Sequence, residues 1–167
     1  MKNIFSAKRF AFVLASVVLV MSFRPSPDKA NFSGDWKLNA GKSELGDFGA
    51  RFAATNIKVD QKADAITIAR TSPGFNGGDP VTNTITLTFD GKEVESTGFN
   101  NSKRKSIASW TNDQTLTINT TTTMERNGQT NEFKGTETWT LSGGSLSIVN
   151  VSSSPRGENT IKAVYDK

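Results

Sequence analysis

Apolar and polar residues alternate along most of the chain after residue 31. In the segment 81–89 (VTNTITLTF) the apolar residues share one face and threonines fill the other; the apolar set is Val81, Ile85, Leu87 and Phe89. The segment 114–124 (QTLTINTTTTM) repeats this pattern. A period of two is typical of a half-buried β-strand, and β-branched threonine suits a pleated surface better than a helix. The interleaved apolar residues argue against the alternative, a low-complexity Ser/Thr tract.

Turn-forming residues divide the alternating region into short segments. Asp90-Gly91 and Asn127-Gly128 are two-residue hairpin signals, because both central positions of a type I′ turn need a positive φ. Looser connections rich in Gly, Pro, Asn and Ser separate the other segments. The predicted strands cover roughly 34–40, 54–60, 65–71, 81–89, 93–98, 104–110, 114–124, 130–141, 145–152 and 159–166. The sequence therefore predicts an antiparallel meander.

An open meander exposes unpaired strand edges, and closure into a barrel removes them. We therefore predict an all-β fold: a single antiparallel up-and-down β-barrel of about 8–10 strands. The segment 41–54 lacks alternation and is rich in glycine, so we expect a short, partly helical segment after the first strand. No repeat of about 20–50 residues is present, which argues against a propeller or solenoid.

The first 22 residues have the layout of a secretory signal peptide. Basic residues precede a mostly apolar run from Ala11 to Phe23, which is too short for a comfortable membrane span. We expect cleavage after Ser22, with cleavage after Ala30 or an uncleaved anchor as alternatives. The sequence then predicts a signal peptide (1–22), a Pro-containing spacer (23–31) and one β-barrel domain (32–167), in a protein that is exported to the periplasm or the extracellular space.

Composition narrows the possible chemistry. The net charge of +4 comes largely from the signal peptide, which leaves 17 basic against 16 acidic residues, so we expect no nucleic-acid partner. The chain has no Cys and no His, which removes the usual ligands of zinc and haem and the base of His-based triads. Lipid attachment through a lipobox Cys is excluded for the same reason. We expect no metal and no cofactor.

The segment around Trp36 resembles a known superfamily. Gly34 and Trp36 in GDWKL match the Gly-X-Trp on the first strand of the calycins, which include lipocalins and fatty-acid-binding proteins. The chain is also similar to bacterial exported lipocalin-like proteins of unassigned activity. The motifs of that second resemblance are W-K-L-N-x-x-K-S (36–43), D-G-K-E (90–93), S-P-R-G-E (154–158) and V-Y-D-K (164–167). Together the motifs span nearly all of residues 32–167, and the resemblance implies that Trp36 is a structural plug at one barrel end, where Gly34 lets the chain cross.

The likeness to fatty-acid binders is incomplete at the last strand. Cytosolic members typically anchor a carboxylate with Arg-X-Tyr, whereas this chain reads Lys162-Ala163-Val164-Tyr165. Only Tyr165 has a counterpart there. The lipocalin Thr-Asp-Tyr motif is missing, and the helical segment is shorter than the usual two-helix lid. The resemblance therefore implies the fold more firmly than the ligand.

One carboxylate stands apart from the others, most of which lie in or beside turns. Glu137 is in the middle of a predicted strand, on the same face as Trp139. If that face points inward, Glu137 needs a basic partner or has a raised pKa. A two-carboxylate glycosidase would need a second such acid, and none is evident. We therefore predict no catalytic residue and no enzyme activity.

Two arginines share a face with apolar residues: Arg70 with Ile66 and Ile68, and Arg104 with Trp110. Either guanidinium is suited to hold an anionic head group inside the barrel; alternatively, both lie at strand ends with solvated tips. Large aromatic residues at alternating positions are ligand walls in one interpretation and core in the other. The candidate ligand-binding residues are Arg70, Phe89, Arg104, Trp110, Phe133, Glu137, Trp139 and Tyr165.

Two functions fit this pattern. The first is a non-enzymatic carrier or sensor of a small apolar or amphipathic ligand; the alternative is a structural or protein-interaction barrel with a filled core. A cavity and a filled core need the same residue types, so the sequence leaves both functions open.

Two other functions are not expected. The Gly-rich segment 72–80 lacks the Lys-Ser/Thr and the helix of a P-loop, so it is not expected to bind phosphate. An outer-membrane barrel is not expected, because aromatic residues are few and the chain ends in Lys167.

Overall fold

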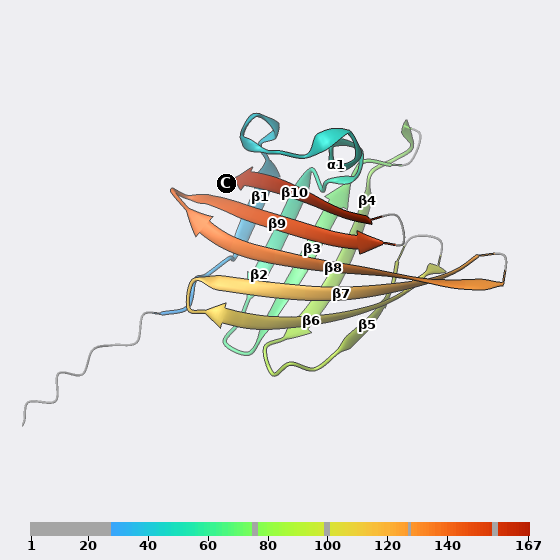
Figure 1. Ribbon diagram of the computed structural model, residues 1–167. Coiled ribbons are helices and arrows are strands. Elements are labelled where there is room, and N and C mark those ends of the chain that lie inside the picture. The colour runs from blue at the N-terminus through green and yellow to red at the C-terminus, as the bar shows by residue number, and fades with distance from the viewer. Residues whose placement is uncertain (1–27, 75–76, 99–100, 127, 155–156) are drawn as a thin grey trace, which may run out of the picture.

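Ten antiparallel strands form one sheet in the computed structural model, which describes residues 28–167 except 75–76, 99–100, 127 and 155–156 (Figure 1). The strands are β1 Gly34–Leu38, β2 Asn56–Gln61, β3 Ala65–Ser72, β4 Val81–Thr88, β5 Val94–Thr97, β6 Lys103–Asn112, β7 Thr115–Arg126, β8 Gln129–Ser142, β9 Ser145–Ser154 and β10 Gly157–Asp166. A 3-10 turn, η1 (Ala40–Lys42), and one short helix, α1 (Gly46–Phe52), follow β1. The prediction of ten strands with a partly helical segment after the first is confirmed.

The sheet curls into a nearly closed barrel. The strand order is β4-β3-β2-β1-β10-β9-β8-β7-β6-β5, so the first and last strands pair at its centre. In Figure 1 the strands β1–β4 cross the strands β6–β10 steeply, as in a sheet folded over itself. The sheet edges, β4 and β5, contact each other, and β4 also contacts β6. Among the described residues no ladder joins β4 to β5.

The Asp90-Gly91 turn differs from the prediction. Gly91 has the expected positive φ of 76°, but the strands on either side do not form a hairpin. Asp90 Oδ1 accepts hydrogen bonds from Thr88 Oγ1 at 2.6 Å and from the Lys92 N–H at 3.2 Å. These local bonds satisfy the turn without a ladder. The β7–β8 pair does form a hairpin, with Arg126 opposite Gln129; Asn127 itself lies outside the described residues.

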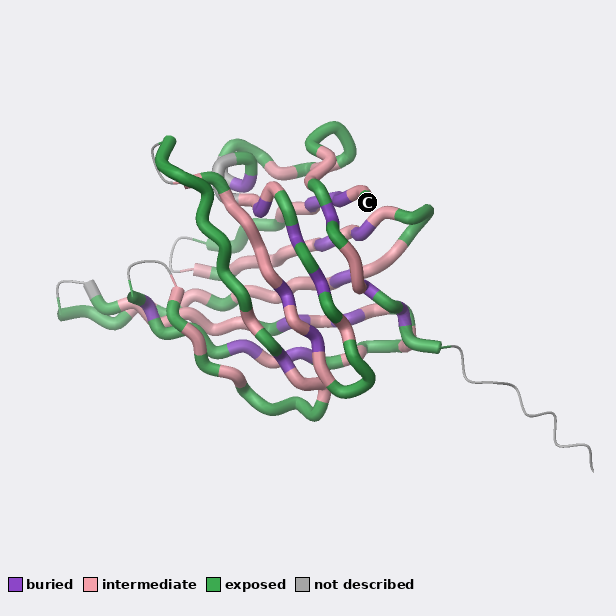
Figure 2. Tube along the Cα trace, turned by 180° about the vertical axis from the view of Figure 1, so that it is seen from behind, coloured by how far each residue is buried: buried purple, intermediate pink, exposed green. Residues whose placement is uncertain are grey.

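Burial follows the alternation seen in the sequence (Figure 2). Ile66 and Ile68 on β3 are buried, as are Leu146 and Ile148 on β9, and their strand neighbours are partly exposed. One residue departs from this pattern. Val81 was expected on the apolar face but is 52% exposed, because it begins β4 beyond the packed part of the interior. Within the described residues, no helix is both long and apolar enough to span a membrane.

Residues 28–33, named here the strap, bind across one end of the barrel. The Ala30 N–H donates to the Asp113 carbonyl at 2.7 Å, and the Phe32 N–H donates to Gln61 Oε1 at 2.9 Å. Gln61 Nε2 in turn donates to the Ala30 carbonyl at 2.9 Å. Part of the segment expected to be a spacer is therefore hydrogen-bonded to the barrel. We call this end the strap end and the opposite end the mouth.

Two of the motifs that carry the resemblance meet beside the β1–β10 pairing. Asn39 Nδ2 donates to Asp166 Oδ2 at 2.6 Å, and Lys42 Nζ lies 3.0 Å from Asp166 Oδ1. Ser43 Oγ accepts from the Val164 N–H at 2.9 Å. W-K-L-N-x-x-K-S and V-Y-D-K thus form one hydrogen-bonded cluster, named here the clasp. The clasp fixes η1 to the last strand, which accounts for these motifs structurally.

Candidate functional site

Aromatic side chains fill the strap end of the barrel interior. The ring of Phe32 stacks on Trp110 with centroids 5.8 Å apart and meets the edge of Trp139 at the same distance. Phe89 packs against Trp110 at 5.4 Å. Phe32 and Trp139 are fully buried, while Phe89 and Trp110 are partly exposed. Three candidate ligand-binding residues, Phe89, Trp110 and Trp139, therefore form core with a strap residue, Phe32, which is not among the candidates.

Trp36 is 2% exposed. Its indole Nε1–H donates to the Phe32 carbonyl at 2.8 Å, and Lys167 Nζ lies 4.8 Å from its ring centroid. Gly34 has a φ of 143°, and a Cβ there would come within 2.9 Å of Lys167 Cε. The positive φ favours glycine at this crossing, whereas the Lys167 side chain is flexible and could move away from a Cβ. Trp36 is held by the strap and the C-terminal residue, a position compatible with the plug expected from the sequence.

Arg70 on β3 and Glu137 on β8 form an ion pair in the middle of the interior. Arg70 Nη1 donates to Glu137 Oε1 at 2.7 Å and Nη2 donates to Oε2 at 2.5 Å. The Trp139 Nε1–H donates to Glu137 Oε2 at 2.9 Å, and the guanidinium lies 5.5 Å from the Trp139 ring centroid. The structure thus brings three predicted site residues together, and the Arg70 guanidinium is ion-paired with Glu137 rather than bonded to solvent alone, as in the alternative interpretation.

Both members of this pair are charged. Burial opposes the charge of Glu137, but attraction to Arg70 and hydrogen bonds from Arg70 and Trp139 outweigh burial, so the pKa of Glu137 lies below its ordinary value. Burial likewise opposes the charge of Arg70, yet Glu137 raises the pKa of Arg70. Burial raises the pKa of Tyr165 to about 12, so its phenol is neutral. The side chains of Arg70 and Glu137 are 32% and 15% exposed, so water reaches the pair.

Toward the mouth the inward-facing residues become polar. Glu137 pairs across the ladder with Asn150 on β9, and Ser106 Oγ lies 3.0 Å from Thr120 Oγ1. Thr120 and Asn150 are partly exposed although they share the face of buried core residues. Solvent therefore reaches this part of the interior. We call Ser106, Thr120, Thr122 and Asn150 the mouth wall.

Arg104 and Phe133 lie still closer to the mouth, opposite Thr122 on either side of β7. Arg104 is exposed and Phe133 is partly exposed. The charge of Arg104 adds a small contribution to the lowered pKa of Glu137, but Arg104 does not join the ion pair. Its position fits the alternative interpretation, a strand end with a solvated tip. The two candidate arginines therefore differ in environment: Arg70 is ion-paired inside the barrel, and Arg104 is exposed at a strand end.

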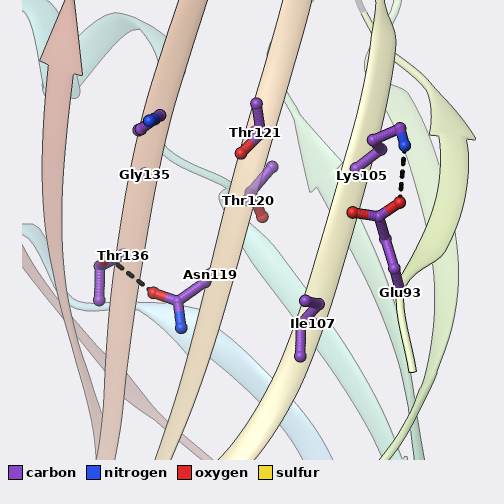
Figure 3. A pocket seen from close by; sticks show the side chains of 9 residues that line it. Glu93, Lys105, Ile107, Asn119, Thr120, Thr121, Gly135 and Thr136 are labelled. Atoms are coloured by element: carbon purple, nitrogen blue, oxygen red, sulfur yellow. Dashed lines mark hydrogen bonds and ion pairs between the residues drawn. The ribbon is translucent and has the colours of Figure 1, made fainter. Parts of the chain in front are cut away.

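Two hollows lie outside the barrel interior. One, of about 310 Å³, is lined by Asp64, Phe89 and Asp90 at the strap end. The other, of about 160 Å³, lies over the outer face of β5–β8 (Figure 3). There Lys105 Nζ and Glu93 Oε1 are 2.7 Å apart. Neither hollow includes the Arg70–Glu137 pair. Among the described residues, no group of three or more acidic side chains is arranged to hold a metal ion.

The polar residues of the mouth wall were missed in the sequence. Ser106 and Asn150 resemble ordinary surface residues when read alone. The available signal was their spacing from buried residues on the same strand. Ser106 lies two residues before Ala108, and Asn150 lies two residues after Ile148; Ala108 and Ile148 are both buried. In a strand, residues two apart point to the same side, so continuing the apolar face along each strand identifies these residues as inward-facing.

Comparison with solved structures identifies the fold class. The ileal bile acid-binding protein of zebrafish, complexed with cholic acid, is 20% identical; the match covers 81% of this chain and 98% of that one, with a TM-score of 0.53. The fatty-acid-binding protein of Manduca sexta is 14% identical, with coverages of 83% and 100% and a TM-score of 0.51. The chain thus has the barrel fold of the fatty-acid-binding proteins, which confirms the calycin resemblance as a statement about fold. No family model and no curated protein matches the sequence.

Proposed function

We propose that this chain is an exported, non-enzymatic protein whose barrel binds a small apolar or amphipathic molecule. The observation that carries the proposal is the division of the interior. Its strap end is packed with apolar and aromatic side chains, whereas its mouth half is lined by polar side chains, of which Ser106 is buried and Thr120, Thr122 and Asn150 are partly exposed. An amphipathic molecule matches such a gradient, because its apolar part removes the inner surface from water while its polar part stays hydrogen-bonded.

The fold supports the same proposal. The two solved structures with this fold are titled as a bile acid-binding and a fatty-acid-binding protein. Export is supported by the leader-like pattern of residues 1–22. N-terminal sequencing of the protein from its own host tests export: a mature chain that begins at Phe23 supports it, and a retained Met1 in the cytoplasmic fraction contradicts it.

A second function is favoured by a specific observation. The strap end is filled by the protein's own aromatic rings, and the two hollows of about 310 and 160 Å³ lie outside the interior. These facts fit a structural or protein-interaction barrel with a filled core. The two functions differ in one measurable respect: only the first requires a small molecule to enter the barrel.

Native mass spectrometry of protein purified from its host distinguishes the two functions. A bound ligand adds a discrete mass to the folded protein, and that mass disappears when the protein is denatured. Protein refolded from denaturant should then rebind a neutral apolar dye such as Nile red. A folded protein that carries no added mass and binds no dye would support the filled barrel.

A further inference from the structure

The charged side chains that face the interior next to the core neutralise each other. Glu137 engages Arg70 through both oxygens, at 2.7 and 2.5 Å, and its Oε2 also accepts the Trp139 indole N–H at 2.9 Å. Bidentate pairing of this kind uses the donors that a guanidinium would otherwise offer to a ligand carboxylate. Arg70 is therefore already occupied by a carboxylate of its own chain.

We propose that the Arg70–Glu137 pair makes the barrel selective for uncharged amphipathic ligands over carboxylates. This inference rests on the proposed function and specifies its ligand class. An incoming carboxylate has two options at the pair: it displaces Glu137, or it lies beside Glu137 as an extra anion. Each option leaves one carboxylate partly buried without a cation, and burying an unpaired charge is far costlier than burying a hydrogen-bonded neutral group.

The mouth wall offers what a neutral polar group needs. The amide of Asn150 lies opposite Glu137 in the ladder, and the hydroxyls of Ser106, Thr120 and Thr122 follow toward the mouth. Gly135 leaves space on this wall, because a Cβ there would meet only Asn150 Nδ2, at 3.9 Å. Hydroxyl and amide groups both donate and accept hydrogen bonds, so an alcohol, ester or amide is satisfied without adding charge.

Arg104 does not reverse this selectivity. It is exposed at the mouth, and its nearest described ladder partners are the neutral residues Ser96 and Thr122. An ion pair formed in water contributes little to binding, since both charges are already solvated. The discrimination against carboxylates therefore occurs at the Arg70–Glu137 pair, deeper in the barrel.

The wild-type protein tests the inference directly with a length-matched pair of probes. Dodecanol and dodecanoate differ in their head group, and dodecanoate is ionised at about pH 8. Each probe is titrated against protein loaded with Nile red. We expect dodecanol to displace the dye with a Kd at least about tenfold lower than that of dodecanoate.

Variants assign the selectivity to the pair. Glu137→Gln keeps an oxygen for the Trp139 indole but releases Arg70, so the ratio of dodecanoate to dodecanol affinity should rise at least about tenfold. Glu93→Gln is the matched control, because Glu93 is paired with Lys105 at 2.7 Å on the outer face; it should leave both affinities unchanged. The double variant Arg70→Leu/Glu137→Leu should gain no dodecanoate binding, which separates a released cation from a loosened barrel.

Two results would overturn the selectivity. One is wild-type protein that binds dodecanoate as tightly as dodecanol. The other is a folded Glu137→Gln protein whose ratio of dodecanoate to dodecanol affinity stays at the wild-type value. If Glu137→Gln does not fold, the wild-type comparison still decides. A wild-type protein that binds neither Nile red nor either probe contradicts the proposed function itself, which is a different pattern from equal binding of the two probes.

Discussion

At the scale of single residues, we expect Trp36 to stabilise the strap end of the barrel. It is 2% exposed and hydrogen-bonded to the Phe32 carbonyl at 2.8 Å. We expect Trp36→Ala to lower the free energy of unfolding by about 3–5 kcal/mol, the range for truncating a buried large aromatic. Urea unfolding measures the loss, and Val81→Ala, at an exposed position, is the control. Thermal unfolding gives a second measure: a variant whose melting temperature lies within a degree or two of the wild-type value would show that Trp36 is not a plug.

The Arg70–Glu137 pair makes a second prediction at this scale. Glu137→Ala leaves a partly buried guanidinium without its partner and removes the acceptor of the Trp139 indole. Breaking such a pair from one side typically costs about 3–5 kcal/mol, whereas replacing both members by apolar residues is often close to neutral. We therefore expect Arg70→Leu/Glu137→Leu to be more stable than Glu137→Ala in urea unfolding. The opposite order would mean that the two charges act independently.

At the scale of elements, the strap joins the barrel through a few residues. A chain that begins at Asn31 loses Ala30, which is 8% exposed, and with it the hydrogen bonds to Asp113 and from Gln61. It also loses the exposed hydrogen bond from Gln114 Nε2 to the Asp28 carbonyl. At about 1 kcal/mol for each hydrogen bond, we expect that chain to be about 2–3 kcal/mol less stable than one that begins at Phe23. Thermal unfolding of the two truncations measures this. Equal stability would show that the strap before Asn31 contributes nothing, and would leave cleavage after Ala30 structurally acceptable.

The clasp should make the stability of the protein depend on pH. Hydrogen bonds from Ser145, Asn39 and Lys42 lower the pKa of Asp166 to about 2. Because the folded pKa lies below the unfolded value of about 3.9, the stabilisation is present above pH 4 and is lost as the pH falls toward 2. Asp166→Asn should therefore be less stable than wild type at neutral pH, and the difference should shrink on acidification. A constant difference between about pH 6 and pH 2 would contradict this role.

At the scale of the whole molecule, the fold could be predicted from local signals, but the site could not. Alternation and turns located ten strands because each strand buries one face. The ladder between β1 and β10 has no local signal, and it brings Asn39 to Asp166 across the chain. Arg70 and Glu137 were each recognised as inward candidates, but their pairing depends on how β3 faces β8 inside the closed barrel. Sequence spacing does not contain that geometry, and for the same reason the strap's Phe32 was missed. The mouth wall was missed for a different reason, because the apolar face was not continued along each strand to its polar residues.

The last prediction concerns the barrel as one cooperative unit. All ten strands belong to one sheet, and Trp36, Trp139 and Phe32 belong to one buried cluster that reaches from the strap to β8. No strand can keep its buried face covered when the others separate, so we expect two-state unfolding. Urea transitions followed by tryptophan fluorescence and by far-ultraviolet circular dichroism should coincide. A neutral ligand at about 100 times its Kd should shift both transitions together, by about 2.7 kcal/mol. Transitions that separate, or a ligand that moves only the fluorescence curve, would mean that the strap end and the mouth unfold as independent parts.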